Sequence, residues 1–142
     1  MTIAKILGTK GTEVVTISGS STVMQAIDLL AEKRIGALPV VEGGEIVGVF
    51  SERDVIYCLR RDGPQILDWP VSRVMTAPAI TVTREESILS ALSQMTRRRI
   101  RHLPVVEEAV LIGIVSIGDL VKHRMDRIQE EAEAMRAYIT NG

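Results

Sequence analysis

The chain repeats one of its segments, and this repeat limits the folds open to it more than any other feature. The segment LPVVEGGEIVGVFSERD, residues 38–54, returns sixty-five residues later as LPVVEEAVLIGIVSIGD, residues 103–119. At this spacing residues 14–56 align with residues 79–121 without a gap, and nine of the twenty-two positions from 35 to 56 are identical. A repeat of this length indicates a duplicated supersecondary unit. In 142 residues, two halves that share a core fit better than two independent domains.

Each copy opens with a predicted strand and a predicted amphipathic helix. The strands are expected at the β-rich residues 14–17 and 79–82. A helix follows each strand, because apolar residues then recur every three or four positions. Residues 20–22 (Ser-Ser-Thr) offer an N-cap to the first helix, and the Thr/Glu spacing of residues 83–86 predicts a capping box for the second.

Each copy continues with a predicted hairpin and a closing helix. Leu-Pro-Val-Val predicts a strand with proline near its first position, and an acidic turn and a second strand follow it. Ser51 and Ser116 then stand as N-caps of the closing helices. Asp54 and Asp119 lie in the first turns, where the helix dipole favours a carboxylate. Each copy therefore predicts the order strand–helix–strand–strand–helix.

The predicted fold class is α/β (α+β), with two pseudo-symmetric repeats packed sheet to sheet. One unit alone would leave an apolar sheet face uncovered, and the second unit covers it. The expected division is an N-terminal arm (residues 1–13), repeat 1 (14–60), a linker (61–78), repeat 2 (79–125) and a C-terminal helical tail (126–142).

The charge and the cysteine content are those of an ordinary soluble protein. A net charge of −1 gives no general attraction to nucleic acid or to anionic lipid. Arg97, Arg98, Arg99 and Arg101 form a basic cluster without aromatic stacking partners, so nucleic acid is not an expected partner. The single cysteine, Cys58, excludes an internal disulfide and is expected to be a buried helix residue. No apolar run is long enough for a membrane span or a secretory signal, and the expected location is cytoplasmic.

The sequence contains no recognisable pattern of catalytic residues. It has no Gly-rich phosphate loop, no metal-ligand cluster and no nucleophile–base pair, so we expect no enzymatic activity. His102 has no second ligand at useful spacing and predicts no metal site, and His123 is expected at the surface. Each aspartate of the two Ser-x-x-Asp motifs, in contrast, offers two acceptor oxygens that match the two donors of a vicinal diol.

Two copies of Leu-Pro-Val-Val, an acidic turn, a Gly-containing strand and Ser-x-x-Asp closely resemble the tandem CBS module, or Bateman module, named after cystathionine β-synthase. The resemblance covers about residues 10–125 and is to the stand-alone class. It implies an adenosine-containing ligand between the repeats (AMP, ADP, ATP, NAD(H) or S-adenosylmethionine), with both ribose hydroxyls bound to the aspartate. It also implies a non-enzymatic, energy-sensing module that regulates a partner protein. A ligand-independent dimeric scaffold is the alternative.

The resemblance further implies two ligand sites, each built from both repeats. The first is expected to comprise Val49, Ser51, Arg53, Asp54, Thr76, Pro78, Ile80, Ile100, Arg101 and His102. The second is expected to comprise Lys10, Glu13, Val15, Ile35, Gly36, Ala37, Ile114, Ser116, Gly118 and Asp119. Gly36 and Ala37 stand where the first set has Arg101 and His102, and Lys10 is the nearest phosphate partner. We therefore expect the Asp54 site to take a phosphorylated ligand.

The C-terminal tail carries a stripe of apolar residues at coiled-coil spacing. These residues, called the tail stripe below, are Met125, Ile128, Ala132, Met135 and Ile139. Just over two heptads are too few to hold a coiled coil alone, but they extend the last helix against a partner. We expect a homodimer to which the tail contributes; a helix that folds back on its own domain is the alternative.

Overall fold

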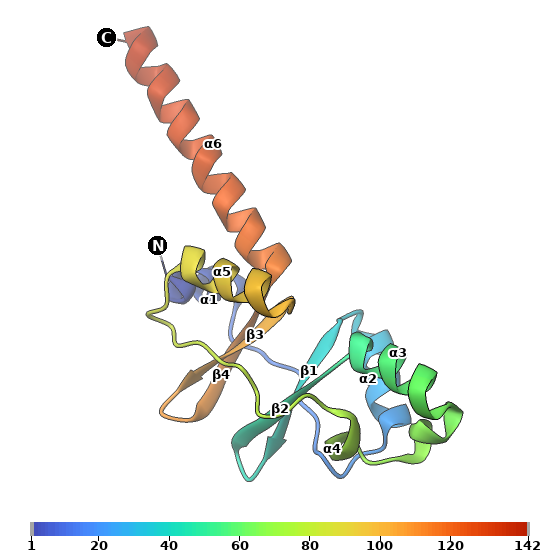
Figure 1. Cartoon of the computed structure of the whole chain (residues 1–142). Coiled ribbons are helices and arrows are strands. Elements are labelled where there is room, and N and C mark those ends of the chain that lie inside the picture. Colours follow the sequence, from blue (N-terminus) through green and yellow to red (C-terminus); the bar gives the residue numbers. More distant parts are fainter. Residues whose placement is uncertain (1, 142) are drawn as a thin grey trace.

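The computed structural model describes residues 2–141 and contains two similar halves (Figure 1). The elements in chain order are α1 (Ile3–Lys10), α2 (Val23–Lys33), β1 (Ala37–Glu42), β2 (Glu45–Ser51), α3 (Glu52–Asp62), the 3₁₀ helix η1 (Pro64–Asp68), α4 (Val71–Val74), α5 (Ile88–Arg98), β3 (His102–Glu107), β4 (Val110–Ser116) and α6 (Ile117–Asn141). Helices α2, α3 and α4 lie beside the first hairpin, and α1, α5 and the start of α6 lie beside the second.

The strands form two antiparallel hairpins that meet at their edges. β1 pairs with β2 and β3 with β4, and each pairing shifts register after the second residue of Pro-Val-Val, at Val40 and at Val105. The hairpins join through one residue pair, Glu45 with Val110, which gives the sheet order β1-β2-β4-β3. The predicted α+β class is confirmed. The two hairpins, one from each repeat, are joined through this pair into one four-stranded sheet.

The two predicted opening strands are reduced to single bridges. Ile17 forms a parallel bridge with Val40, and Val82 forms the equivalent bridge with Val105. The Ile17 amide donates to Pro39 (3.1 Å), and its carbonyl accepts from Val41 (2.9 Å). The remaining residues of each segment have no strand beside them, and a β-rich sequence needs such neighbours to form a strand. The prediction of strands at residues 14–17 and 79–82 was therefore wrong in extent.

Both first helices begin at equivalent residues of the repeat. Thr22 caps α2 and forms a capping box with Gln25, as the Ser-Ser-Thr segment predicted. Ser87, not Thr83, caps α5, and its hydroxyl accepts from the amide of Ser90 at 3.0 Å. The capping box predicted at residues 83–86 was wrong, because those residues form a turn before the helix. Ser87 lies sixty-five residues after Thr22, which is the spacing of the duplication.

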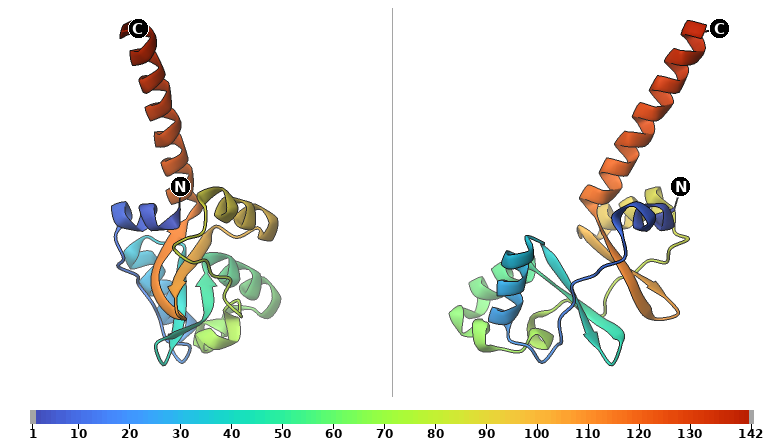
Figure 2. Two further views of the ribbon diagram at one scale, coloured as in Figure 1. Left: turned by 90° about the vertical axis from the view of Figure 1, so that its left-hand side faces the viewer. Right: turned by 180° about the vertical axis from the view of Figure 1, so that it is seen from behind.

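The buried side chains form two cores rather than the one shared core expected from the length of the chain. Each half is completed by the segment that precedes the other half. The expected N-terminal arm is the helix α1, and its Ile3, Ile6 and Leu7 are buried in the core of the second half. In the expected linker, Ile66 of η1 and Val71 of α4 are buried in the core of the first half. Figure 2 shows the N-terminal segment crossing from α1, beside α5, to the first half.

The two closing helices end differently. α3 ends at Asp62, and Gly63 adopts a positive φ of 79° there. α6 continues for 25 residues and extends away from both halves (Figures 1 and 2). All residues from 128 to 141 are exposed. Residues 126–141 are therefore helical, and residues 128–141 do not pack back on either half.

Candidate functional site

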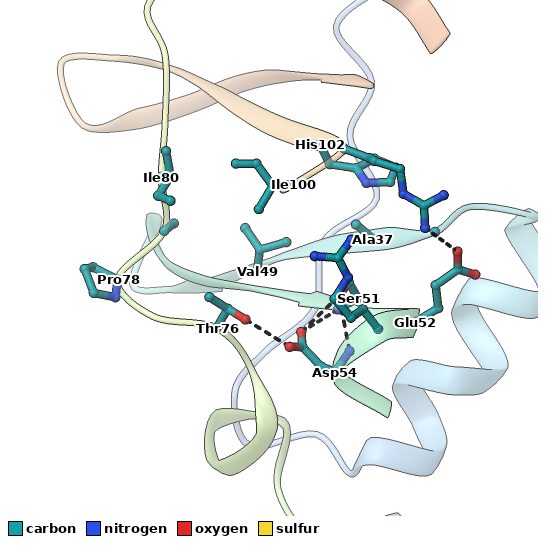
Figure 3. A pocket seen from close by; sticks show the side chains of 14 residues that line it. Ala37, Val49, Ser51, Glu52, Asp54, Thr76, Pro78, Ile80, Ile100 and His102 are labelled. Atoms are coloured by element: carbon teal, nitrogen blue, oxygen red, sulfur yellow. Dashed lines mark hydrogen bonds and ion pairs between the residues drawn. The ribbon is translucent and has the colours of Figure 1, made fainter. Parts of the chain in front are cut away.

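A cavity lies between the two repeats, at the N-terminus of α3 (Figure 3). Its lining residues are Gly36, Ala37, Val49, Ser51, Glu52, Arg53, Asp54, Thr76, Pro78, Ala79, Ile80, Ile100, Arg101 and His102. All ten residues predicted for the first site are among them. They come from β1, β2 and α3 of the first half, and from the segments before α5 and β3 of the second half.

Asp54 lies at the floor of the cavity and already caps its own helix. The Ser51 amide donates to its Oδ2 at 2.9 Å and the Ser51 hydroxyl at 3.2 Å, while the Asp54 amide donates back to Ser51 Oγ at 3.4 Å. The Thr76 hydroxyl donates to Oδ1 at 2.9 Å (Figure 3). Thr76 is held there because its backbone exchanges two hydrogen bonds with Val49, both of 2.9 Å. The Oδ2 atom of Asp54 thus caps α3, and the Oδ1 atom accepts from an uncharged hydroxyl.

Basic groups line one side of the cavity. Arg53 donates to the carbonyl of Arg99 at the C-terminus of α5, which ties α3 to the second half. Arg101 forms a 3.4 Å ion pair with Glu52, and both residues line the cavity. Both side chains of this pair are more than half exposed, so solvent screens it and it stabilises the fold little. Arg101 therefore stays available to an anionic ligand.

His102 lies between the two repeats, where burial disfavours its charged form. Burial lowers the pKa of His102, and the positive charges of Arg101 and Lys10 lower it further. The negative charges of Glu52 and Asp119 oppose that shift without cancelling it. The imidazole is therefore neutral near pH 7 and presents one donor and one acceptor nitrogen.

Apolar residues form the opposite side. Val49 from β2, Ile80 from the segment before α5, and Ile100 from the segment before β3 project into the cavity (Figure 3). Aliphatic walls of this kind suit a flat, largely apolar ring. The sequence assignment did not include Glu52 or Ala79 among the lining residues. Each of the two is next to a predicted residue in the sequence, and this adjacency was the one signal that could have indicated them.

Only part of the second predicted set comes together. Lys10 Nζ donates to Asp119 Oδ2 at 2.6 Å and to the Ile114 carbonyl at 2.9 Å. Asp119 also forms a cap with Ser116, whose amide donates to it at 2.8 Å. Burial acts to raise the pKa of Asp119, but hydrogen bonds from Lys10 and Ser116 outweigh burial and hold the pKa below its usual value. The second aspartate is thus already paired with a cation.

The remaining residues of the second set lie in several places. Gly36 and Ala37 line the first cavity, so their assignment to the second site alone was wrong. Val15 and Ile35 pack against the core of the first half, and Glu13 and Gly118 are exposed. Lys10 and Asp119 border a hollow between α1 and α6.

Other residues singled out by the sequence have ordinary environments. Cys58 is buried in α3, as predicted. Arg97, Arg98 and Arg99 are exposed at the end of α5. His123 is half-buried rather than on the surface, because α6 lies against α1 at this level. Within residues 2–141 there is no cluster of three side chains suited to a metal ion, and no helix is long and apolar enough to cross a bilayer.

Comparison with known protein families gives two matches in this chain. The model of the CBS domain matches residues 9–61 and residues 71–126. The mitochondrial CBS domain-containing protein CBSX3 of Arabidopsis thaliana is 37% identical over 126 residues, which are 85% of this chain and 61% of that protein. The chain therefore spans less than two thirds of this relative. The CBS domain-containing protein YhcV of Bacillus subtilis is 34% identical over 87% of both chains.

Solved structures share the same arrangement of elements. The CBS-domain containing protein ATU1752 from Agrobacterium tumefaciens is 34% identical and superposes with a TM-score of 0.84, covering 87% of this chain and 99% of its own. The CBS domain pair of protein MJ0100, solved in complex with 5′-methylthioadenosine and S-adenosyl-L-methionine, is 22% identical with a TM-score of 0.78. It covers 89% of this chain and 98% of its own. At that identity the likeness shows the fold alone.

Proposed function

The chain belongs to the CBS-domain family, and from this premise we propose that it is a non-enzymatic regulatory module that binds an AMP-type, adenosine-containing ligand at Asp54. The bound ligand changes how the two halves sit together, and a partner protein responds to that change. Such coupling needs a ligand that binds the two arrangements with different affinity. The proposed location remains cytoplasmic, and no nucleic acid or membrane takes part.

The observation that carries this proposal is the cavity at Asp54, where three kinds of group converge. The carboxylate offers acceptors for the two ribose hydroxyls. Val49, Ile80 and Ile100 offer an aliphatic slot for adenine. The guanidinium groups of Arg53 and Arg101 offer donors for a phosphate. The adenosine compounds bound by the CBS domain pair of MJ0100 support the same class of ligand.

Calorimetric titration of the nucleotide-free protein tests this proposal. AMP, ATP, NADH and S-adenosylmethionine are titrated separately, and 2′,3′-dideoxyadenosine serves as the control because it keeps adenine but lacks the diol. We expect saturable binding of at least one of the four compounds and none of the dideoxy control. No saturable heat and no thermal stabilisation with any compound would overturn the proposal in favour of a scaffold.

The tail stripe favours a second role, in which the chain assembles with another copy of itself. Met135 is 59% exposed and Ile139 is 70% exposed on a helix that nothing else in residues 2–141 covers over residues 128–141. An apolar seam of this spacing is buried when two such helices pack together. We propose a homodimer to which α6 contributes, whether or not a ligand is bound.

Sedimentation equilibrium of a charge variant tests the dimer. Met135→Glu places a carboxylate in the tail stripe, and we expect the dimer to dissociate at least tenfold more readily than the wild type. Ala134→Glu adds the same charge one residue away, off the stripe, and is expected to leave the dimer unchanged. A wild-type chain that is monomeric at tens of micromolar would contradict the proposal.

A further inference from the structure

Asp54 and Asp119 occupy equivalent positions in the two repeats, yet their third contacts differ in charge. Asp54 accepts from the neutral Thr76 hydroxyl at 2.9 Å, and Asp119 accepts from the Lys10 ammonium at 2.6 Å. Both contacts cross between the halves. Thr76 precedes the second repeat and contacts the first, and Lys10 precedes the first and contacts the second. The duplication thus keeps the cap and changes the group that faces the carboxylate.

The packing of α1 explains why Lys10 reaches Asp119. In the first half, Met75 covers Gly48, where an added Cβ would lie 2.7 Å from Met75 Sδ. In the second half, Leu7 covers the equivalent Gly113, where an added Cβ would lie 2.6 Å from Leu7 Cδ2. Lys10 follows Leu7 by three residues and so lies on the same face of α1, one turn further along. The buried Leu7 therefore directs Lys10 toward the start of α6.

The contact with Ile114 fixes the ammonium in place. In the first half, the equivalent residue Val49 exchanges two backbone hydrogen bonds with Thr76, which keeps the Thr76 side chain at the rim of the cavity. In the second half, the Ile114 carbonyl accepts from Lys10 Nζ at 2.9 Å instead. The ammonium thus bridges the carboxylate and a strand carbonyl. Both side chains of the pair are at least partly shielded from solvent.

We propose that Lys10 determines which of the two Ser-x-x-Asp aspartates accepts a ribose. Its ammonium is bonded to Oδ2 of Asp119, the oxygen that also caps α6, and it neutralises the carboxylate that a diol would need as an acceptor. The chain then binds one adenosine at Asp54 and none at Asp119. At Asp54, the hydroxyls of an entering diol take the place of the Thr76 hydroxyl, which is also uncharged. A diol that approaches Asp119 competes with a charge-assisted contact, which is stronger than a neutral one. This inference rests on the proposed function of the Asp54 cleft.

Titration with adenosine tests the inference by stoichiometry. We expect one site per wild-type chain and two sites per Lys10→Met chain, because removal of the ammonium frees the Asp119 carboxylate. Adding Asp119→Ala to Lys10→Met is expected to remove the second site again. Lys10→Arg keeps the cation and is expected to bind as the wild type does. Lys5→Met, on the same helix, is the matched control for the loss of a lysine.

The outcomes separate this inference from the proposed function. One site in both the wild type and Lys10→Met overturns the role of Lys10 and leaves the Asp54 site standing. Two sites in the wild type also overturn it. No binding to either protein overturns both proposals. Far-UV circular dichroism checks that Lys10→Met is folded, and Lys10→Ala, with the same expected stoichiometry, replaces it if it is not.

Discussion

Replacing Asp54 by alanine is expected to weaken the binding of AMP about a hundredfold. The substitution removes both acceptors offered to the ribose diol, and two charge-assisted hydrogen bonds are together worth about 3 kcal/mol. Asp54→Ala also removes the capping contacts with Ser51, which costs about 1 kcal/mol of unfolding free energy. Calorimetric titration measures the first effect, and the midpoint of urea denaturation measures the second.

Asp54→Asn separates ligand binding from helix capping. The amide keeps one oxygen that accepts from the Ser51 amide, so the unfolding free energy is expected to stay within about 0.5 kcal/mol of the wild type. The other oxygen becomes a donor and loses the charge, and AMP binding is expected to fall nearly as far as in Asp54→Ala. Asp119→Asn is the control in the other repeat and is expected to change the affinity of the Asp54 site less than threefold. Wild-type affinity in Asp54→Asn would show that the aspartate serves only as a cap.

Much of the fold was predictable because the repeat supplies the same information twice. The hairpins, the closing helices and the Ser-x-x-Asp caps follow from strand and helix patterns that agree between the copies. The α5 cap was misplaced because the Thr83–Glu86 spacing was judged alone. The sixty-five-residue shift from Thr22 would have selected Ser87. The opening strands failed because their formation depends on a neighbouring strand, which no local pattern reveals.

The first cavity could be assigned from the resemblance because its residues lie at fixed positions in the repeated motifs. The pairing of Lys10 with Asp119 could not be assigned in that way. It depends on α1 crossing to the second half, and the apolar spacing of Ile3, Ile6 and Leu7 indicates a helix face without naming its partner. The difference between the surroundings of Asp54 and Asp119 thus comes from tertiary packing outside the repeated segments.

The burial of α1 in the second core leads to a large expected effect on stability. Leu7 is 2% exposed and lies directly over Gly113 of β4. Leu7→Ala leaves a cavity there, because a glycine has no side chain to fill it, and is expected to lower the unfolding free energy by about 2–5 kcal/mol. Urea denaturation followed by far-UV circular dichroism measures this loss.

Thr9→Ala provides the matched control for Leu7→Ala, since Thr9 is exposed on the same helix. It is expected to change the unfolding free energy by no more than about 0.5 kcal/mol. If residues 1–13 were only an arm, Leu7→Ala would behave like Thr9→Ala, and the second half would be stable without α1. A large loss of unfolding free energy in Leu7→Ala, without one in Thr9→Ala, would instead show that α1 is part of the second core. The same packing holds Lys10 at Asp119, so the stability of the second half and the pairing of its aspartate both depend on one buried leucine.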